Sequence, residues 1–370
     1  MPSISPVELR HSLHQTPELM FEEYETTRLL NDALSALPGI IIHHPLPTGL
    51  VVEYKVNEGD YLLFRADIDA LPMKEKTGIS FASRNNFMHA CGHDVHSSTM
   101  YGFVKYVVEE KINQNIIFLF QPGEEGGGGA QKVIDSGILE KFAISKAFAL
   151  HVTDEYSAGT IASTSGVLFA SSVEIDIKFI GKAAHIAFPD RGINAMTAMR
   201  KFLDKTDDII AAYSEPVLFG CGKSYSGVVR NIIPAESVCE CTLRTLSVKD
   251  LKGITDKFES ELQQIQAEMG ISYDLTIRAP YTEVVVDSSL YTLCSNALSK
   301  EFEIIDCGYK MTAEDFGLFS RKYPAYMFWL GTSLGEYYGL HTPQFLPDDS
   351  MIEKGIRAFS LILSAMMEQK

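Results

Sequence analysis

The chain has 370 residues, a length that favours two domains over a single core. Hydrophobic residues make up 46% and charged residues 22% of it, as in globular proteins. The formal charge of -16 argues against nucleic acid or an anionic membrane as partner, because both are negatively charged. No apolar run approaches the ~20 residues of a membrane span, and the start Met1–Ser5 lacks the pattern of a secretory signal.

Scattered cysteines predict a chain without a disulfide framework, which fits the reducing cytoplasm. Cys239 and Cys241 alternate with other residues on a predicted strand, so we interpret them as small core residues and not as a metal pair. The full set is Cys91, Cys221, Cys239, Cys241, Cys294 and Cys307.

The N-terminal part predicts a helix pair within 7–36 and then two strands, Leu50–Val56 and Tyr61–Ala66. His11 and His14, in the helix pair, are interpreted as surface or local structural residues. Asp67 and Asp69 follow the second strand, where open α/β sheets place their ligands. The alternative is an acidic loop, but the segment that follows favours a supporting role for Asp67.

That segment, Met88–His96, contains three histidines, one cysteine and one aspartate. Thiolate and imidazole are ligands of zinc and of similar divalent ions. Gly92 separates Cys91 from His93, and its conformational freedom lets both side chains turn toward one point. The alternative is a polar loop with a buried structural cysteine. Further ligands or supporting groups can come from His89, Asp94 and His96.

A helix at Ser97–Glu110 and a buried strand at Ile116–Phe120 lead into a loop with the adjacent pair Glu124 and Glu125. Four glycines follow, but no Gly-Lys-Ser/Thr, so we reject a phosphate-binding P-loop. Neighbouring residues point in different directions. One carboxylate can therefore bind a metal while the other moves a proton.

A helix at Ala130–Ser136 precedes the apolar strand Lys146–Leu150, which ends in His151, a further ligand candidate. The pattern then changes at residue 168, because Ser172–Ile180 alternates apolar and polar residues as a half-exposed antiparallel strand does. The order β-α-β-β-α-β predicts a ferredoxin-like α+β domain inserted at 168–282. Its other predicted elements are Gly192–Tyr213, Tyr225–Pro234, Glu236–Thr245, Val248–Met269 and Ser272–Ile277.

The α/β pattern resumes with a helix at Ser288–Ser299, a strand at Ala325–Leu330 and a helix at Asp349–Met367. Residues 1–167 and 283–370 are therefore expected to form one discontinuous domain, a central, mostly parallel sheet flanked by helices. His341 lies between the last strand and the last helix, which returns it to the C-terminal edge of the sheet.

Five candidate ligands are more than one tetrahedral zinc needs. With a carboxylate, Glu124, left over, the set suits two metal ions ~3.5–4 Å apart that share a water, which is the chemistry of amide or ester hydrolysis. The thiolate favours zinc, although manganese, cobalt or nickel can occupy such a site. The candidates are Cys91, His93, Glu125, His151 and His341.

Taken together, the motifs resemble the metal-dependent amidohydrolases that include aminoacylases, glutamate carboxypeptidases and dipeptidases. The branch that the chain matches includes hippurate hydrolases and auxin-amino-acid hydrolases. The matching motifs are Arg-Ala-Asp-Ile-Asp-Ala-Leu-Pro (65–72), Met-His-Ala-Cys-Gly-His-Asp (88–94), Gln-Pro-Gly-Glu-Glu-Gly (121–126), Leu-His-Val (150–152) and Leu-His-Thr-Pro (340–343).

The resemblance implies that the five candidates are the metal ligands, Glu124 the general acid/base and Asp67 a supporting carboxylate. It also implies that the inserted domain is a lid through which a homodimer forms. His185, in Gly-Lys-Ala-Ala-His, matches a lid histidine that binds the substrate carbonyl oxygen. Asn231 and Arg244 match lid positions linked to substrate binding, where an arginine can bind a carboxylate. The alternative for Arg244 is a surface strand arginine.

Four further segments resemble bacterial deacetylases of this branch, which act on an N-acetylated diamino acid: 148–156, 166–170, 311–317 and 327–331. Two departures bear on the acyl-group preference. Gly123 stands where alanine is usual, and Ala183-Ala184 where glycines are usual. A hippurate-like or general N-acyl amino acid substrate, and a metal-free binding protein on the same fold, are the alternatives.

Overall fold

The computed structural model describes residues 4–369, which fold into two compact units. Within the described residues, unit 1 comprises the chain up to Leu168, Val284–Tyr309 and the chain from Asp315 onward. Unit 2 comprises Phe169–Glu283 and Lys310–Glu314. The sequence predicts one uninterrupted insertion. It does not indicate that the short segment 310–314 also belongs to unit 2.

Unit 1 is built on an eight-stranded sheet in the order β1-β2-β4-β3-β5-β14-β6-β13. The four central strands, β4, β3, β5 and β14, run parallel, whereas β2 joins β4 and β6 joins β14 in antiparallel pairs. The predicted mostly parallel sheet is confirmed. The strands are β1 (Ile41–His43), β2 (Leu50–Tyr54), β3 (Tyr61–Asp67), β4 (Asn115–Gln121), β5 (Ile144–Ser157), β6 (Ile161–Ser163), β13 (Ile304–Asp306) and β14 (Ala325–Ser333).

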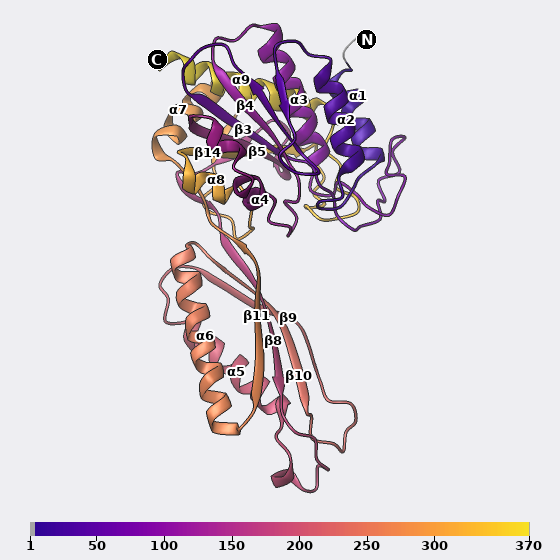
Figure 1. Cartoon of the computed structure of the whole chain (residues 1–370), viewed down its shortest axis with the longest axis vertical. Helices are drawn as coiled ribbons and strands as arrows, with labels where there is room; N and C mark the ends of the chain where they lie inside the picture. Colours follow the sequence, from indigo (N-terminus) through magenta and orange to yellow (C-terminus); the bar gives the residue numbers. More distant parts are fainter. Residues whose placement is uncertain (1–3, 370) are drawn as a thin grey trace. The chain divides into compact units, whose positions relative to one another are not determined.

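Helices flank this sheet, with α3 packed against α9 and α1 (Figure 1). Phe64 on β3 lies at the centre of the core, with ring centroids 4.8 Å from Phe103 on α3 and 4.9 Å from Phe148 on β5. The helices of unit 1 are α1 (Pro6–Gln15), α2 (Tyr24–Ser35), α3 (His93–Glu109), α4 (Gly129–Asp135), the 3₁₀ helix Ile138–Lys141, α7 (Ser288–Leu298), α8 (Gly317–Lys322) and α9 (Ser350–Glu368). Among the described residues, no helix has the length and apolar character to cross a membrane.

The strand that carries His151 is longer than predicted. The sequence indicated that it ends at Leu150, but β5 continues to Ser157. The reason is its partner on one side, since β14 pairs with β5 as far as Ser157. On the other side the pairing with β3 ends at Ala149. His151 is therefore inside a strand, just past the point where pairing with one neighbour stops.

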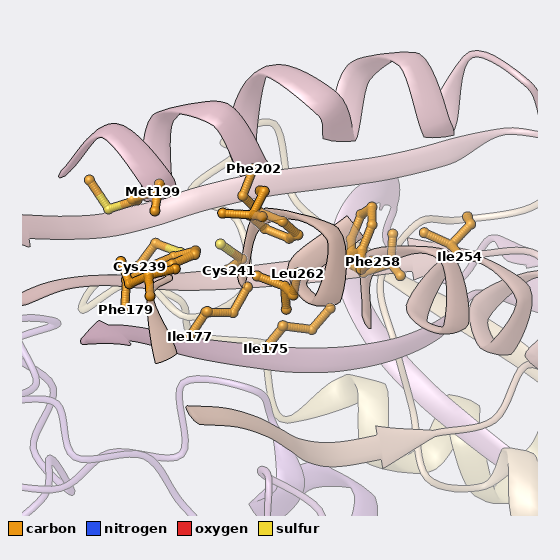
Figure 2. Close-up of a cluster of buried hydrophobic side chains, with 14 of the residues drawn as sticks. Ile175, Ile177, Phe179, Met199, Phe202, Cys239, Cys241, Ile254, Phe258 and Leu262 are labelled. Carbon is orange, nitrogen blue, oxygen red and sulfur yellow. The ribbon is translucent and has the colours of Figure 1, made fainter. Parts of the chain in front are cut away.

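Unit 2 has a four-stranded antiparallel sheet in the order β11-β8-β10-β9, with α5 and α6 on one face (Figure 1). Side chains from both helices and the sheet form its core, in which Cys239 and Cys241 are 0% and 6% exposed (Figure 2). The predicted ferredoxin-like order and the two core cysteines are confirmed. The elements are β8 (Ser171–Ile180), the 3₁₀ helix Pro189–Arg191, α5 (Ala195–Ile210), β9 (Val217–Ser226), β10 (Glu236–Thr245), α6 (Val248–Met269) and β11 (Ser272–Tyr281).

The prediction for the second strand of this unit was wrong. The strand expected at Tyr225–Pro234 is β9, Val217–Ser226. Gly227 has φ +67°, a left-handed conformation that ends the extended run. Pro234 has no N–H for a sheet ladder, so residues 227–235 form the connection to β10. Two short strands, β7 (Gly166–Phe169) and β12 (Val284–Val286), pair with each other. In the sequence they lie at the two points where the chain enters and leaves unit 2.

Candidate metal centre

A tight turn presents Cys91 and His93 from the N-terminus of α3. Gly92 is the residue before the helix and has φ +85°. A Cβ at this position would lie 2.3 Å from Cγ2 of Val152 on β5, so another residue would displace that side chain and would also have to adopt the positive φ. The glycine therefore lets the backbone approach the strand that carries His151, which brings Cys91 and that histidine together.

The structure brings all five predicted ligands together in unit 1. Sγ of Cys91 lies 3.4 Å from Nε2 of His151 and 3.3 Å from Nε2 of His341. Nε2 of His341 also lies 3.2 Å from Oε1 of Glu125. Among the groups of donor atoms within 4.8 Å of one another, two consist of predicted ligands alone, Cys91–His93–His151 and Cys91–Glu125–His341. The two groups share Cys91, which places its sulfur between two potential metal positions.

Hydrogen bonds orient the two buried histidines so that a lone pair faces this centre. Nδ1 of His93 donates to the Asp69 carbonyl oxygen at 2.9 Å, and Nδ1 of His151 donates to the Val152 carbonyl oxygen at 2.7 Å. Nε2 therefore bears the lone pair in each neutral ring. Nε2 of His93 is buried and has no hydrogen-bond partner. A metal ion would satisfy this nitrogen, and the Cys91 sulfur and Nε2 of His151 are suitable ligands for the same ion.

The electrostatics of the centre also fit a cation. Burial, together with the negative charges of Glu125 and Glu124, raises the pKa of the Cys91 thiol well above its usual value. Burial lowers the pKa of His93, but the charge of Asp67 and the hydrogen bond to Asp69 outweigh it and raise this pKa to about 10. The cluster of carboxylates and a potential thiolate thus attracts positive charge, which divalent ions would supply.

Glu124 lies beside the centre and is only 6% exposed. One of its carboxylate oxygens is within 4.8 Å of donor atoms of His93 and Glu125. The loop that carries it is fixed at the next residue, because the N–H of Glu125 donates to Oδ2 of Asp69 at 2.9 Å. The two adjacent carboxylates therefore lie at the same centre.

Asp67 is fully buried beside the centre and is held by two neighbouring side chains. Its Oδ2 accepts from Nη1 of Arg65 at 2.7 Å, and its Oδ1 accepts from Nδ1 of His96 at 2.6 Å. Burial raises the pKa of Asp67, but the positive charges of His93 and Arg65 and the hydrogen bond from His96 outweigh it and hold this pKa well below its usual value. Oδ1 of Asp67 also lies 3.7 Å from Nε2 of His93, so this carboxylate is charged and adjacent to the centre.

The other polar residues of Met88–His96 separate into different roles. Nε2 of His96 accepts from the Val152 N–H at 2.9 Å while Nδ1 binds Asp67, so His96 offers no lone pair to a metal. Oδ2 of Asp94 accepts from Nε of Arg10 at 3.0 Å and binds Nδ1 of His14 at 2.8 Å. His14 is 2% exposed, which excludes a surface position and leaves the structural interpretation.

Three buried aspartates take part in this network without a role assigned from the sequence. Asp69 contacts both His93 and Glu125, and its position two residues after Asp67 is the available signal. Asp315 accepts from Nη2 of Arg65 at 2.8 Å; an arginine within an apolar strand indicates a buried anion. Asp154 accepts from two backbone N–H groups near His341 and has no sequence signal beyond its closeness to His151.

In unit 2, the structure brings His185 and Asn231 together but not Arg244. The Ile186 N–H donates to the Asn231 carbonyl oxygen at 3.0 Å, and His185 pairs with Ile232 in an isolated β-bridge. These residues lie beyond Ile180, which pairs with Glu236, whereas Arg244 pairs with Ser172 at the other end of the same sheet. Eight residues along β8 at roughly 3.3 Å each put about 26 Å between the two ends.

Comparisons with known proteins agree with this architecture. Residues 63–365 match the model of peptidase family M20/M25/M40. The chain is 36% identical to the N-acetyldiaminopimelate deacetylase of Exiguobacterium sibiricum, across 94% of this chain and 95% of that one. It is 35% identical to the protein of the same name from a Geobacillus species, across 96% of each.

A solved structure extends the likeness to the fold. The YXEP protein of Bacillus subtilis, described as a dinuclear metal-binding peptidase from the M20 family, is 27% identical with a TM-score of 0.84. The match covers 98% of both chains. The match to the family model, the near full-length relatives and the shared fold lead to one conclusion: this chain belongs to peptidase family M20/M25/M40.

Proposed function

We propose that this chain is a metal-dependent deacetylase that converts N-acetyl-LL-2,6-diaminopimelate and water to LL-diaminopimelate and acetate. The observation that carries the proposal is the Cys91-centred cluster with Glu124 beside it, in a chain whose near full-length relatives are named N-acetyldiaminopimelate deacetylase. The reaction belongs to the acetylase branch of lysine biosynthesis. The cytoplasmic location expected from the sequence stays a prediction.

Two divalent ions would be held by the two groups that share Cys91. His93 and His151 complete one group, and Glu125 and His341 complete the other. Zinc is the preferred ion because of the thiolate, with manganese, cobalt or nickel as alternatives. When bound, such a pair supplies a nucleophilic water at neutral pH and polarises the acyl carbonyl.

The protein's own contribution to the reaction centres on Glu124. Its carboxylate takes the proton of the attacking water and then delivers it to the nitrogen of the departing amine. Glu124 is nearly buried, which limits its contact with bulk water. Asp67 stays ionised between Arg65 and His96, and His96 in turn accepts from the Val152 N–H next to His151.

The unit 2 residues would act on the substrate from two different subunits. His185 donates to the acyl carbonyl oxygen, with Asn231 next to it, while Arg244 binds a substrate carboxylate. Within one chain the two ends of the sheet are about 26 Å apart, from eight residues at roughly 3.3 Å each, which is too far for one small substrate to reach both. A homodimer through unit 2 resolves this, and β9 is an edge strand with Leu218 and Tyr225 exposed.

The substrate is tested by side-by-side rates on N-acetyl-LL-diaminopimelate, hippurate and N-acetylmethionine. The proposal predicts the highest kcat/KM on the diaminopimelate derivative, and a higher value on hippurate would replace it with a hippurate hydrolase. Position 123, next to Glu124, bears on this choice. A Cβ there would lie 2.5 Å from Cζ of Phe21. The Phe21 ring therefore fills the space that the methyl group of the usual alanine would need.

Two measurements test the remaining parts of the proposal. A metal assay on gently purified protein should find about two ions per chain, and less than one would favour a binding protein without catalysis. Sedimentation should give a dimer. An enzyme that is fully active as a monomer would exclude a His185 that acts across subunits.

A further inference from the structure

Among the five predicted ligands, His341 has the weakest local support. Its side chain is 52% exposed, and its backbone has φ +60°, a left-handed conformation that non-glycine residues rarely adopt. It lies in a segment outside the helices and strands, between β14 and α9. The N–H of His341 donates to the Ala90 carbonyl oxygen at 2.9 Å, which ties this residue to the Cys91 segment.

A second tie comes from β5. Oδ2 of Asp154 accepts from the Tyr338 N–H at 2.7 Å and from the Gly339 N–H at 3.0 Å. Gly339 has φ +82°, so the two successive N–H groups converge on one carboxylate oxygen just before His341. Hydrogen bonds to an ionised acceptor are stronger than neutral ones, and here they fix the direction from which the chain approaches the centre.

Burial of the Asp154 carboxylate is energetically unfavourable, and closing a surface loop would not require it. The side chain is 7% exposed, and its Oδ1 is buried without a hydrogen-bond partner. Tyr338 is 47% exposed, so water could satisfy its N–H if the segment were free to move. A buried, half-satisfied carboxylate is therefore explained better by the need for one defined loop position than by loop stability.

We propose that Asp154 is a positioning residue that sets the place of His341 beside Cys91 and Glu125. Because β5 also carries His151, this strand then determines the position of two predicted ligands, one directly and one through two backbone hydrogen bonds. Asp154 acts on the affinity of the site for the ion that His341 holds. The inference rests on the metal assignment in the proposed function.

The test compares Asp154→Ala with Asp154→Asn and with Glu155→Ala. Alanine removes the acceptor, whereas asparagine keeps one oxygen for the two N–H groups and loses only the charge. Glu155 is the exposed neighbour, so its replacement removes the same charge one residue along the strand. Zinc alone is titrated into the metal-free full-length chain against a chromophoric chelator, without substrate.

For Asp154→Ala we expect one of two zinc ions to bind at least tenfold more weakly and the other to bind as in the wild type. Asp154→Asn should stay within about threefold, and Glu155→Ala should match the wild type. Activity of the alanine variant should recover at raised zinc concentration, which a general loss of structure would not allow. If alanine prevents folding, Asp154→Ser, too short to reach both N–H groups, takes its place.

Wild-type affinity for both ions in Asp154→Ala, or in the serine variant, would overturn the inference. So would equal weakening in Asp154→Ala and Glu155→Ala. The readout separates this inference from the proposed reaction. A wild type that binds two zinc ions but does not release acetate would contradict the deacetylase proposal while leaving the role of Asp154 standing.

Discussion

The Cys91 centre in unit 1 and the His185–Asn231 corner in unit 2 carry the two sets of predicted functional residues, and they are built differently. At the centre, the side chains of His93, Asp67 and His151 are buried and held by side-chain and backbone hydrogen bonds. At the corner, His185 and Asn231 are exposed and their segments are joined by backbone contacts.

This difference indicates how each set would reach its working geometry. The buried part of the centre is preorganised, because hydrogen bonds orient His93 and His151 before any substrate arrives. The exposed corner has fewer fixed side-chain contacts, although Nδ1 of His185 accepts from the Ala187 N–H at 3.1 Å. Substitutions at the two places should therefore separate metal binding, chemistry and substrate binding.

The largest effect is expected at the proton-transfer group of the centre. Glu124→Gln keeps the shape and a polar oxygen but cannot accept a proton, so kcat should fall by about 10⁴-fold, the upper range for general acid–base catalysis. Metal content should stay at the wild-type value, because the five ligands are intact. Steady-state kinetics with a metal assay measure both, and wild-type turnover would remove Glu124 from the mechanism.

A smaller loss is expected at the exposed corner. His185→Ala should lower kcat by about 10²- to 10³-fold, the range measured when one donor to a developing oxyanion is removed. Metal content and melting temperature should not change, because this side chain is exposed and outside the core. Mixing this variant with Glu124→Gln sharpens the comparison. If His185 acts across subunits, hybrid dimers regain activity, whereas a mixture that stays inactive contradicts exchange of residues between subunits.

Arg244 gives an intermediate case, because it is half-buried in unit 2 and its Nη1 donates to the Met311 carbonyl oxygen at 2.8 Å. Arg244→Lys keeps the charge but loses the paired geometry that binds a carboxylate. We expect KM to rise by about 10- to 100-fold, as for the loss of a charged hydrogen bond, with a smaller change in kcat. An unchanged KM would identify Arg244 as a structural strand residue.

The smallest effect on activity is expected beneath the centre, where His14 contacts Asp94 and Glu75. Burial lowers the pKa of His14, but the charge of Asp94, the hydrogen bond with Asp94 and the nearby Glu75 carboxylate outweigh it and raise this pKa to about 9. Because the folded pKa exceeds the usual 6.5, the stabilisation is complete below about pH 6.5 and disappears as the pH rises through about 9.

His14→Gln should therefore lower the melting temperature most near pH 6. The deficit corresponds to on the order of 3 kcal/mol, at 1.36 kcal/mol for each pKa unit. It should shrink toward pH 9.5, where the wild type loses the same charge. Thermal unfolding at both pH values measures this, and a deficit that grows with pH would contradict the charged pairing of His14.

The sequence predicted features that depend on local patterns, and it misplaced features that depend on partners distant in the chain. The ferredoxin-like order and the core cysteines follow from period-two alternation, which is a local signal. The end of β5 was misplaced because it depends on where β3 and β14 stop pairing with it. The wrong position of β9 has a similar origin, since an exposed edge strand has little apolar pattern to reveal it.

By itself the sequence determined the chemistry: which donor types are present, that a glycine separates Cys91 from His93, and that two carboxylates adjoin at 124 and 125. Only the tertiary structure decided that Cys91 is shared by two donor groups, that His96 is not available to a metal, that Asp69 binds His93 and Glu125, and that Asp154 binds the backbone just before His341. The reason is physical. Residue type fixes what a side chain can bind, whereas the direction of each lone pair depends on partners distant in the chain.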